Sequence, residues 1–153
     1  MHARGLSAPR PGTTIIVISG RRAVTLTALL VFLTGAGCGT NKDERSVGAV
    51  TDRFYSALRN HAGDRACAQL SQGAANTLAS ASGGSCAQAI TRLQLPGVRA
   101  SHSVVYLDSA RAEVAGAQPG EAAFLDRTPL GWRISAAGCR PKGEGPYDCE
   151  LQG

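Results

Sequence analysis

The clearest chemistry in this sequence belongs to its five cysteines, at positions 38, 67, 86, 139 and 149. A thiol can bind a metal ion, act as a nucleophile or pair into a disulfide. Zinc sites and catalytic dithiols normally use two cysteines within a few positions, whereas the nearest pair here, Cys139 and Cys149, is ten positions apart. We therefore expect no metal site, no redox site and no cofactor.

The first 37 residues have the parts of an export signal. They contain no acidic residue and four basic ones, Arg4, Arg10, Arg21 and Arg22. An uncharged run follows at 23–34, and its twelve residues are too few to cross a membrane, which takes about 20. We predict a signal peptide over residues 1–37. The Arg21-Arg22 pair leaves both the general and the twin-arginine export routes open.

The segment that ends this leader, Leu33-Thr34-Gly35-Ala36-Gly37-Cys38, resembles the lipobox of bacterial lipoproteins, although Gly35 stands where an aliphatic residue is preferred. The resemblance implies cleavage before Cys38 and a diacylglycerol on its thiol, with palmitate as an expected acyl chain. It places the protein on the outer face of the plasma membrane, held by lipid. An ordinary secretory signal, with Cys38 as a free or paired thiol, is the alternative.

Cleavage before Cys38 leaves a short polar segment, residues 38–45, as a lipid-anchored tether, and residues 46–153 as a single domain. The mature part carries 12 basic and 11 acidic residues. This balance lacks the positive surface that binds a phosphate backbone, so we expect no nucleic-acid partner.

In an exported domain the four remaining cysteines, Cys67, Cys86, Cys139 and Cys149, form an even set for two disulfides. Four cysteines allow three pairings. The pairing of sequence neighbours, Cys67 with Cys86 and Cys139 with Cys149, is favoured because each pair brackets a plausible helix connection or loop. Their predicted role is structural.

Helices are predicted first along the domain. Val47, Val50, Phe54 and Leu58 recur three and four residues apart from Ser46 onward, as on one face of a helix. A second helix is predicted from Asp64 to about Leu70, and a third from Cys86 to about Leu93 with Ser85 as its cap.

Alternating apolar residues then predict strands, because every second side chain of a strand faces the same side. We expect one hairpin from strands 104–107 and 110–115, and a second from strands 121–126 and 132–135. The fold class is α+β, with N-terminal helices packed on a curved antiparallel sheet and stapled by two disulfides.

Three segments, Val50 to Leu58, Gly131-Trp132-Arg133-Ile134 and Ala137-Gly138-Cys139, look like small lipoproteins of GC-rich Gram-positive bacteria. The order of helices and strands is similar to the nuclear transport factor 2-like (cystatin-like) cone. The resemblance implies a pocket near Tyr55, Tyr106 and Trp132, and a disulfide-clipped tail, 138–149, laid over the sheet. In enzymes of this fold, acidic side chains such as Asp108 and Asp126 would be candidate bases.

No Ser-His-Asp order, G-x-S-x-G motif or phosphate-binding glycine loop occurs in the sequence. We therefore expect no enzyme. The predicted function is a membrane-anchored cell-envelope lipoprotein, a non-catalytic interaction module that meets an envelope protein. The alternative is a cone whose pocket binds a small ligand.

Overall fold

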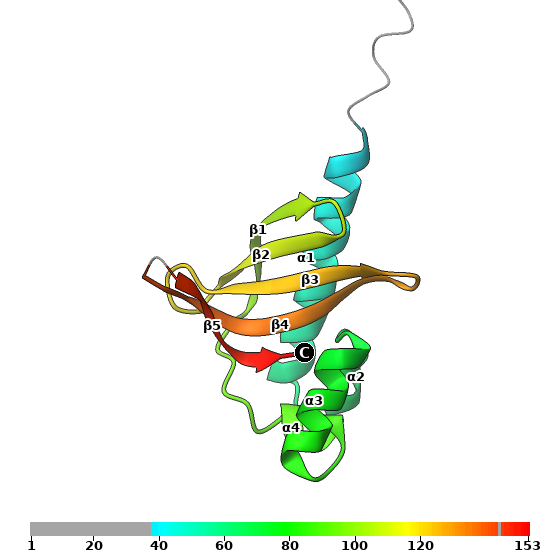
Figure 1. The fold of residues 1–153 in the computed structure, drawn as a ribbon, viewed down its shortest axis with the longest axis vertical. Helices are drawn as coiled ribbons and strands as arrows, with labels where there is room; N and C mark the ends of the chain where they lie inside the picture. The colour runs from blue at the N-terminus through cyan, green and yellow to red at the C-terminus, as the bar shows by residue number, and fades with distance from the viewer. Residues whose placement is uncertain (1–37, 144) are drawn as a thin grey trace, which may run out of the picture. The chain divides into compact units, whose positions relative to one another are not determined.

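The computed structural model describes residues 38–143 and 145–153, and the predicted signal peptide, 1–37, lies outside the described residues. Helices precede strands, as predicted (Figure 1). The helices are α1 (Cys38–Arg59), α2 (Gly63–Cys67), α3 (Gln72–Ser82) and α4 (Cys86–Ile90). The strands are β1 (Arg99–Tyr106), β2 (Ser109–Ala115), β3 (Ala122–Thr128), β4 (Gly131–Lys142) and β5 (Gly145–Gln152).

Helix α1 is longer than the sequence pattern predicts. It begins at Cys38, not at Ser46, so the residues predicted as a tether are helical. The Ser46 hydroxyl donates to the carbonyl of Lys42, which is a bond made inside a helix. The predicted start at Ser46 was wrong because the prediction followed the apolar stripe, which begins only there. The polar turns before it are compatible with a helix and gain a contact with β3.

Three short helices follow α1. Helix α4 begins with the capping box of Ser85 and Gln88, as the predicted cap requires, but it ends at Ile90. Helix α3 was not predicted, because its small residues leave only Ala74 buried and give no apolar periodicity. Its ends nevertheless carry ordinary signals, since the Ser71 side chain accepts from the backbone of Ala74 and Gly83 takes the left-handed conformation at φ 64°.

The five strands form one antiparallel sheet in the order β1-β2-β3-β4-β5. The predicted hairpins are confirmed, although β1, β3 and β4 extend by two or more residues beyond their predicted bounds and β2 begins one residue earlier than predicted. The tail is not laid over the sheet. It pairs with β4 as the edge strand β5, with Ala137 opposite Leu151 and Cys139 opposite Cys149. The prediction failed because an exposed edge strand needs only backbone pairing and shows little apolar alternation.

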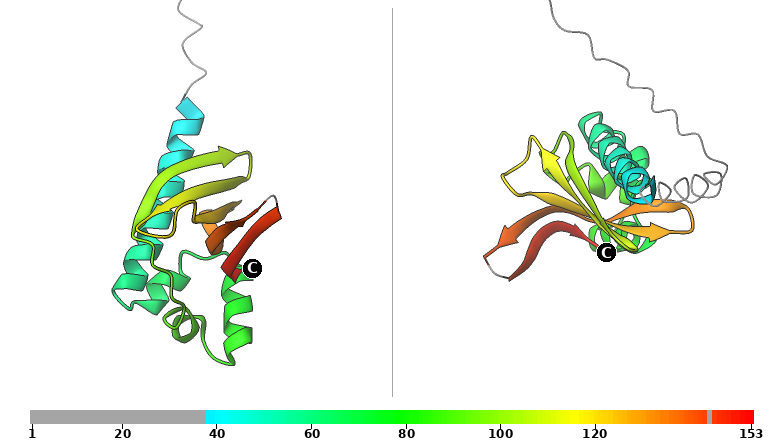
Figure 2. Two further views of the ribbon diagram at one scale, coloured as in Figure 1. Left: turned by 90° about the vertical axis from the view of Figure 1, so that its left-hand side faces the viewer. Right: turned by 90° about the horizontal axis from the view of Figure 1, so that it is seen from above.

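Helix α1 lies along one face of the sheet (Figure 2). Val47, Val50 and Phe54 are buried there, which confirms the predicted stripe. Strand β2 contributes the small side chains of Ala110 and Ala112, so the helix approaches closely. The short helices join β4 through backbone bonds, from Ser71 to the carbonyl of Ile134 and from Ile134 to that of Gln69.

The predicted disulfide pairing is present. Cys67 is bonded to Cys86, which ties α2 to α4, and Cys139 is bonded to Cys149 across neighbouring strands. The Cys67–Cys86 link closes a span of 19 residues in a layer built mostly from alanine and other small side chains. A small domain of this kind depends on covalent links because its core is modest.

The double variant Cys67→Ala/Cys86→Ala is expected to lose roughly 3 kcal/mol of unfolding free energy, since the open chain gains entropy when unfolded. Urea unfolding followed by circular dichroism measures the loss. The native spectrum should stay unchanged under folding conditions. A loss below about 1 kcal/mol would show that the packing of α2 on α4 holds this layer without the bond.

Candidate functional site

Cys38, the predicted lipid-bearing residue, is the first residue of α1. Five positions later Asp43 makes a two-point ion pair with Arg127 of β3, with Oδ2 2.7 Å from Nη2 and Oδ1 3.3 Å from Nη1. A bidentate guanidinium–carboxylate pair fixes orientation as well as distance. The start of the helix is therefore pinned to the sheet.

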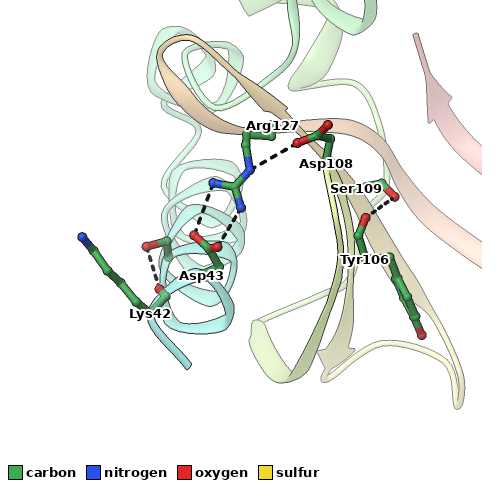
Figure 3. A network of polar contacts seen from close by, with 7 residues as sticks. Lys42, Asp43, Tyr106, Asp108, Ser109 and Arg127 are labelled. Carbon is green, nitrogen blue, oxygen red and sulfur yellow. Dashed lines mark hydrogen bonds and ion pairs between the residues drawn. The ribbon is translucent and has the colours of Figure 1, made fainter. Parts of the chain in front are cut away.

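Arg127 is the centre of this network (Figure 3). Its Nε lies 3.6 Å from the Asp108 carboxylate, and its backbone N–H donates to the Asp108 carbonyl at 2.7 Å. Its guanidinium carbon sits 4.4 Å from the centre of the Trp132 ring. The hydrogen bonds from Arg127 hold the pKa of Asp43 below its ordinary value. Arg127 thus joins α1, the β1–β2 turn and β4.

This contact could not be predicted from the sequence, because Asp43 and Arg127 are 84 positions apart and both lie among ordinary polar residues. Asp108 and Asp126 were the acidic candidates. Asp108 has a side chain that is 87% exposed, and Asp126 is exposed on β3. Neither aspartate lies in an enclosed pocket, where a catalytic base would be expected.

The three predicted pocket residues lie in different surroundings. Tyr55 is fully buried, with its ring edge-to-face to Phe54 at 5.1 Å. Tyr106 is 61% exposed at the end of β1. Trp132 is 3% exposed under Arg127, in the wall of an open groove of about 350 Å³ beside α1. The structure does not bring them together around one cavity.

A second polar site was not predicted from the sequence. Glu121 is only 3% exposed, and its Oε1 has no hydrogen-bond partner within the described chain. Burial raises the pKa of its carboxyl, an effect partly offset by the backbone of Gln118 and the charge of Arg140. The hydroxyl of Tyr55 is likewise buried and unpartnered, and burial followed by the charge of Glu121 raises its pKa.

Glu121 lies in the wall of a pocket of about 230 Å³. The ion pair of Arg140 with Glu150 stands beside it. Gly138 forms another part of the wall at φ 64°, and a Cβ there would come within 2.5 Å of Leu95. A carboxyl in such a pocket accepts hydrogen bonds, and in its protonated form it can also donate one. We call Glu121, the Tyr55 hydroxyl and this pocket the Glu121 site.

A further open groove of about 500 Å³ runs between α1 and α2. Ala57 and Ala68 give it an apolar floor, and Arg53 donates to the side chain of Gln69 at 3.1 Å across it. Its walls are polar and exposed.

Among residues 38–143 and 145–153, no three His, Cys, Asp or Glu side chains are grouped so that they could hold a metal ion. In the same part of the chain no helix combines the length and apolar character needed to span a bilayer. Comparison with protein-family models, curated proteins and solved structures finds no match to this chain.

The variant Glu121→Gln should make stability less dependent on pH. Because the folded pKa is raised, the native state of the wild type keeps a proton that the unfolded chain releases near pH 4.3, at about the ordinary pKa of glutamate. Wild-type stability therefore falls as pH rises through the folded pKa. The variant should be more stable than wild type at pH 8 and differ little at pH 4, as thermal unfolding across pH would measure.

Glu113→Gln is the matched control, because it removes a partly exposed glutamate that pairs with Arg111 on neighbouring β2. It should give no comparable gain at pH 8. An equal response of the two variants would show that burial of Glu121 has no energetic consequence.

Proposed function

We propose that this protein is a membrane-anchored lipoprotein of the cell envelope that acts as a non-catalytic interaction module. The observation that carries the proposal is that Cys38 lies in α1 and that this helix continues without a break from Cys38 into the core. Lipid on Cys38 would therefore hold a folded domain directly at the outer face of the plasma membrane. Two disulfides agree with an exported location.

The packing favours an interaction role over a large internal pocket. We assign the domain to the nuclear transport factor 2-like (cystatin-like) cones, on the support of helices followed by a five-stranded antiparallel sheet that packs against α1. In this assignment Val47, Phe54 and Tyr55, each fully buried, fill the face where a cone pocket would lie. The exposed features, such as the groove between α1 and α2, then offer the surface for an envelope partner.

A small-ligand binder is the second candidate, and the Glu121 site is the observation that favours it. Buried polar atoms nearly always have hydrogen-bond partners, so two unpartnered ones near one pocket suggest a molecule that supplies them. The pocket volume of about 230 Å³ would suit a few heavy atoms with a hydrogen-bond donor and an acceptor.

The anchor is tested by the intact mass of the mature protein from the membrane fraction, before and after reduction. The full chain expressed in a GC-rich Gram-positive host should yield residues 38–153 plus diacylglycerol, about four daltons lighter than its reduced form because two disulfides lack four hydrogens. Cys38→Ala should carry no lipid and leave the membrane fraction. An unlipidated wild-type product would refute the lipoprotein assignment.

Native mass spectrometry of the detergent-extracted protein separates the two candidates. An interaction module should appear without a bound small molecule in wild type and in Glu121→Gln alike. A ligand binder should carry an added small mass that Glu121→Gln reduces at least about tenfold, the effect of losing roughly 1.4 kcal/mol of binding free energy. The Glu113→Gln variant is again the control and should match wild type.

A further inference from the structure

Two hairpin turns lie at the same end of the sheet, beside the first turns of α1. In an antiparallel meander alternate turns share one end, and here they are the β1–β2 turn and the β3–β4 turn. Arg127 holds both near the helix through its contacts with Asp43 and Asp108 (Figure 3). Leu130, in the β3–β4 turn, lines the same groove as Asp43 and Trp132.

These turns carry exposed apolar side chains. Among the residues that the structure describes, four large apolar side chains are exposed, and three are at this end: Leu107 at 90%, Leu130 at 80% and Tyr106 at 61%. The fourth, Val98 at 41%, directly precedes β1 at the opposite end of the sheet. Exposed apolar groups gathered at one end mark a contact surface.

The backbone at Leu107 adds an independent argument. Tyr106 pairs with Ser109, so Leu107 and Asp108 form a two-residue turn. Leu107 has φ 55°, a left-handed conformation that favours glycine at the first position of such a turn. A leucine here strains the backbone and places its side chain in water. Local strain of this kind persists where the side chain serves a function outside the fold.

We propose that Tyr106, Leu107 and Leu130, which we call the apolar tips, insert into the outer leaflet beside the lipid on Cys38. The inference rests on the proposed lipoprotein function. Cys38 precedes Asp43 by five helical residues, about 7.5 Å along the axis, so the anchor and the tips belong to the same end of the domain.

The chemistry of this end suits a lipid surface. Leucine side chains partition into the acyl region, and tyrosine favours the interface between headgroups and acyl chains. Asp43 and Asp108 both pair with Arg127 there, and Arg53 and Arg133 line the groove that contains Leu130. The proposed contact is driven by insertion of the apolar tips, so it is tested with neutral lipid.

The test uses single tryptophans at the tips as depth probes. Leu107→Trp and Leu130→Trp, purified as the mature lipoprotein, are reconstituted into phosphatidylcholine vesicles with or without bromine on the acyl chains. Insertion by about 5–10 Å should quench the added fluorescence roughly twofold, after the signal of Trp132, measured with the wild-type protein in the same vesicles, is subtracted. The replaced side chains are exposed, so the core is unchanged.

Val98→Trp is the matched control and should show no quenching above wild type, because it lies at the far end of β1. Equal, low quenching at all three positions would overturn the proposal and leave the tips free for a protein partner. The intact mass of each sample reports lipidation separately. If the samples carry no lipid, the lipoprotein assignment fails, but the tips can still be tested. The same variants are then coupled through the Cys38 thiol to maleimide-bearing lipid, and quenching at Leu107→Trp and Leu130→Trp again supports or overturns insertion.

Discussion

The fold depends on the burial of one helix face. Helix α1 packs against β1, β2, β4 and α2, so its apolar stripe reaches most of the domain. Val47, Val50 and Phe54 supply the large side chains of this contact. The facing sheet contributes alanines such as Ala110 and Ala112. The hydrophobic contribution scales with the apolar area buried, so a sheet face built of small residues needs the helix close to it. Helix α2 packs on α1 and is tied to α4 by the Cys67–Cys86 bond, and α3 packs on α4, β4 and β5.

The N-terminal turns of α1 are held by a polar contact and not by the core. They extend past β1 and β2 (Figure 1), and residues 41–45 there are all polar. Arg127 holds them through a bidentate pair to Asp43 and stacks over Trp132. Exposed ion pairs add little to global stability, so the contact is better understood as local ordering. It turns a polar segment into a continuation of the helix that leads from Cys38 into the core.

The predictable parts of this structure are those whose cause is local. The stripe of α1, the Ser85 cap of α4, the hairpins and the sequence-neighbour disulfides all follow from residue spacing. The helical segment before Ser46 depends on Arg127, which is 84 positions from Asp43, and spacing does not report such a partner. Edge strand β5 pairs with the adjacent strand β4, but it is mostly exposed and shows little apolar alternation. The burial of Glu121 could not be predicted either, since nothing in Gly120-Glu121-Ala122 distinguishes a buried glutamate from an exposed one.

Leu107 and Glu121 both contradict the residue type that their surroundings favour. A turn at φ 55° favours glycine, and a buried wall favours an apolar side chain over a carboxyl with an unpartnered oxygen. Such conflicts between a residue and its local surroundings point to selection for something other than stability. They differ in kind, because Leu107 offers apolar surface outward whereas Glu121 keeps polar atoms inside. Leu107 is suited to contact with an extended surface such as a membrane, whereas Glu121 is suited to a small molecule. A single domain can therefore carry both features without competition between them.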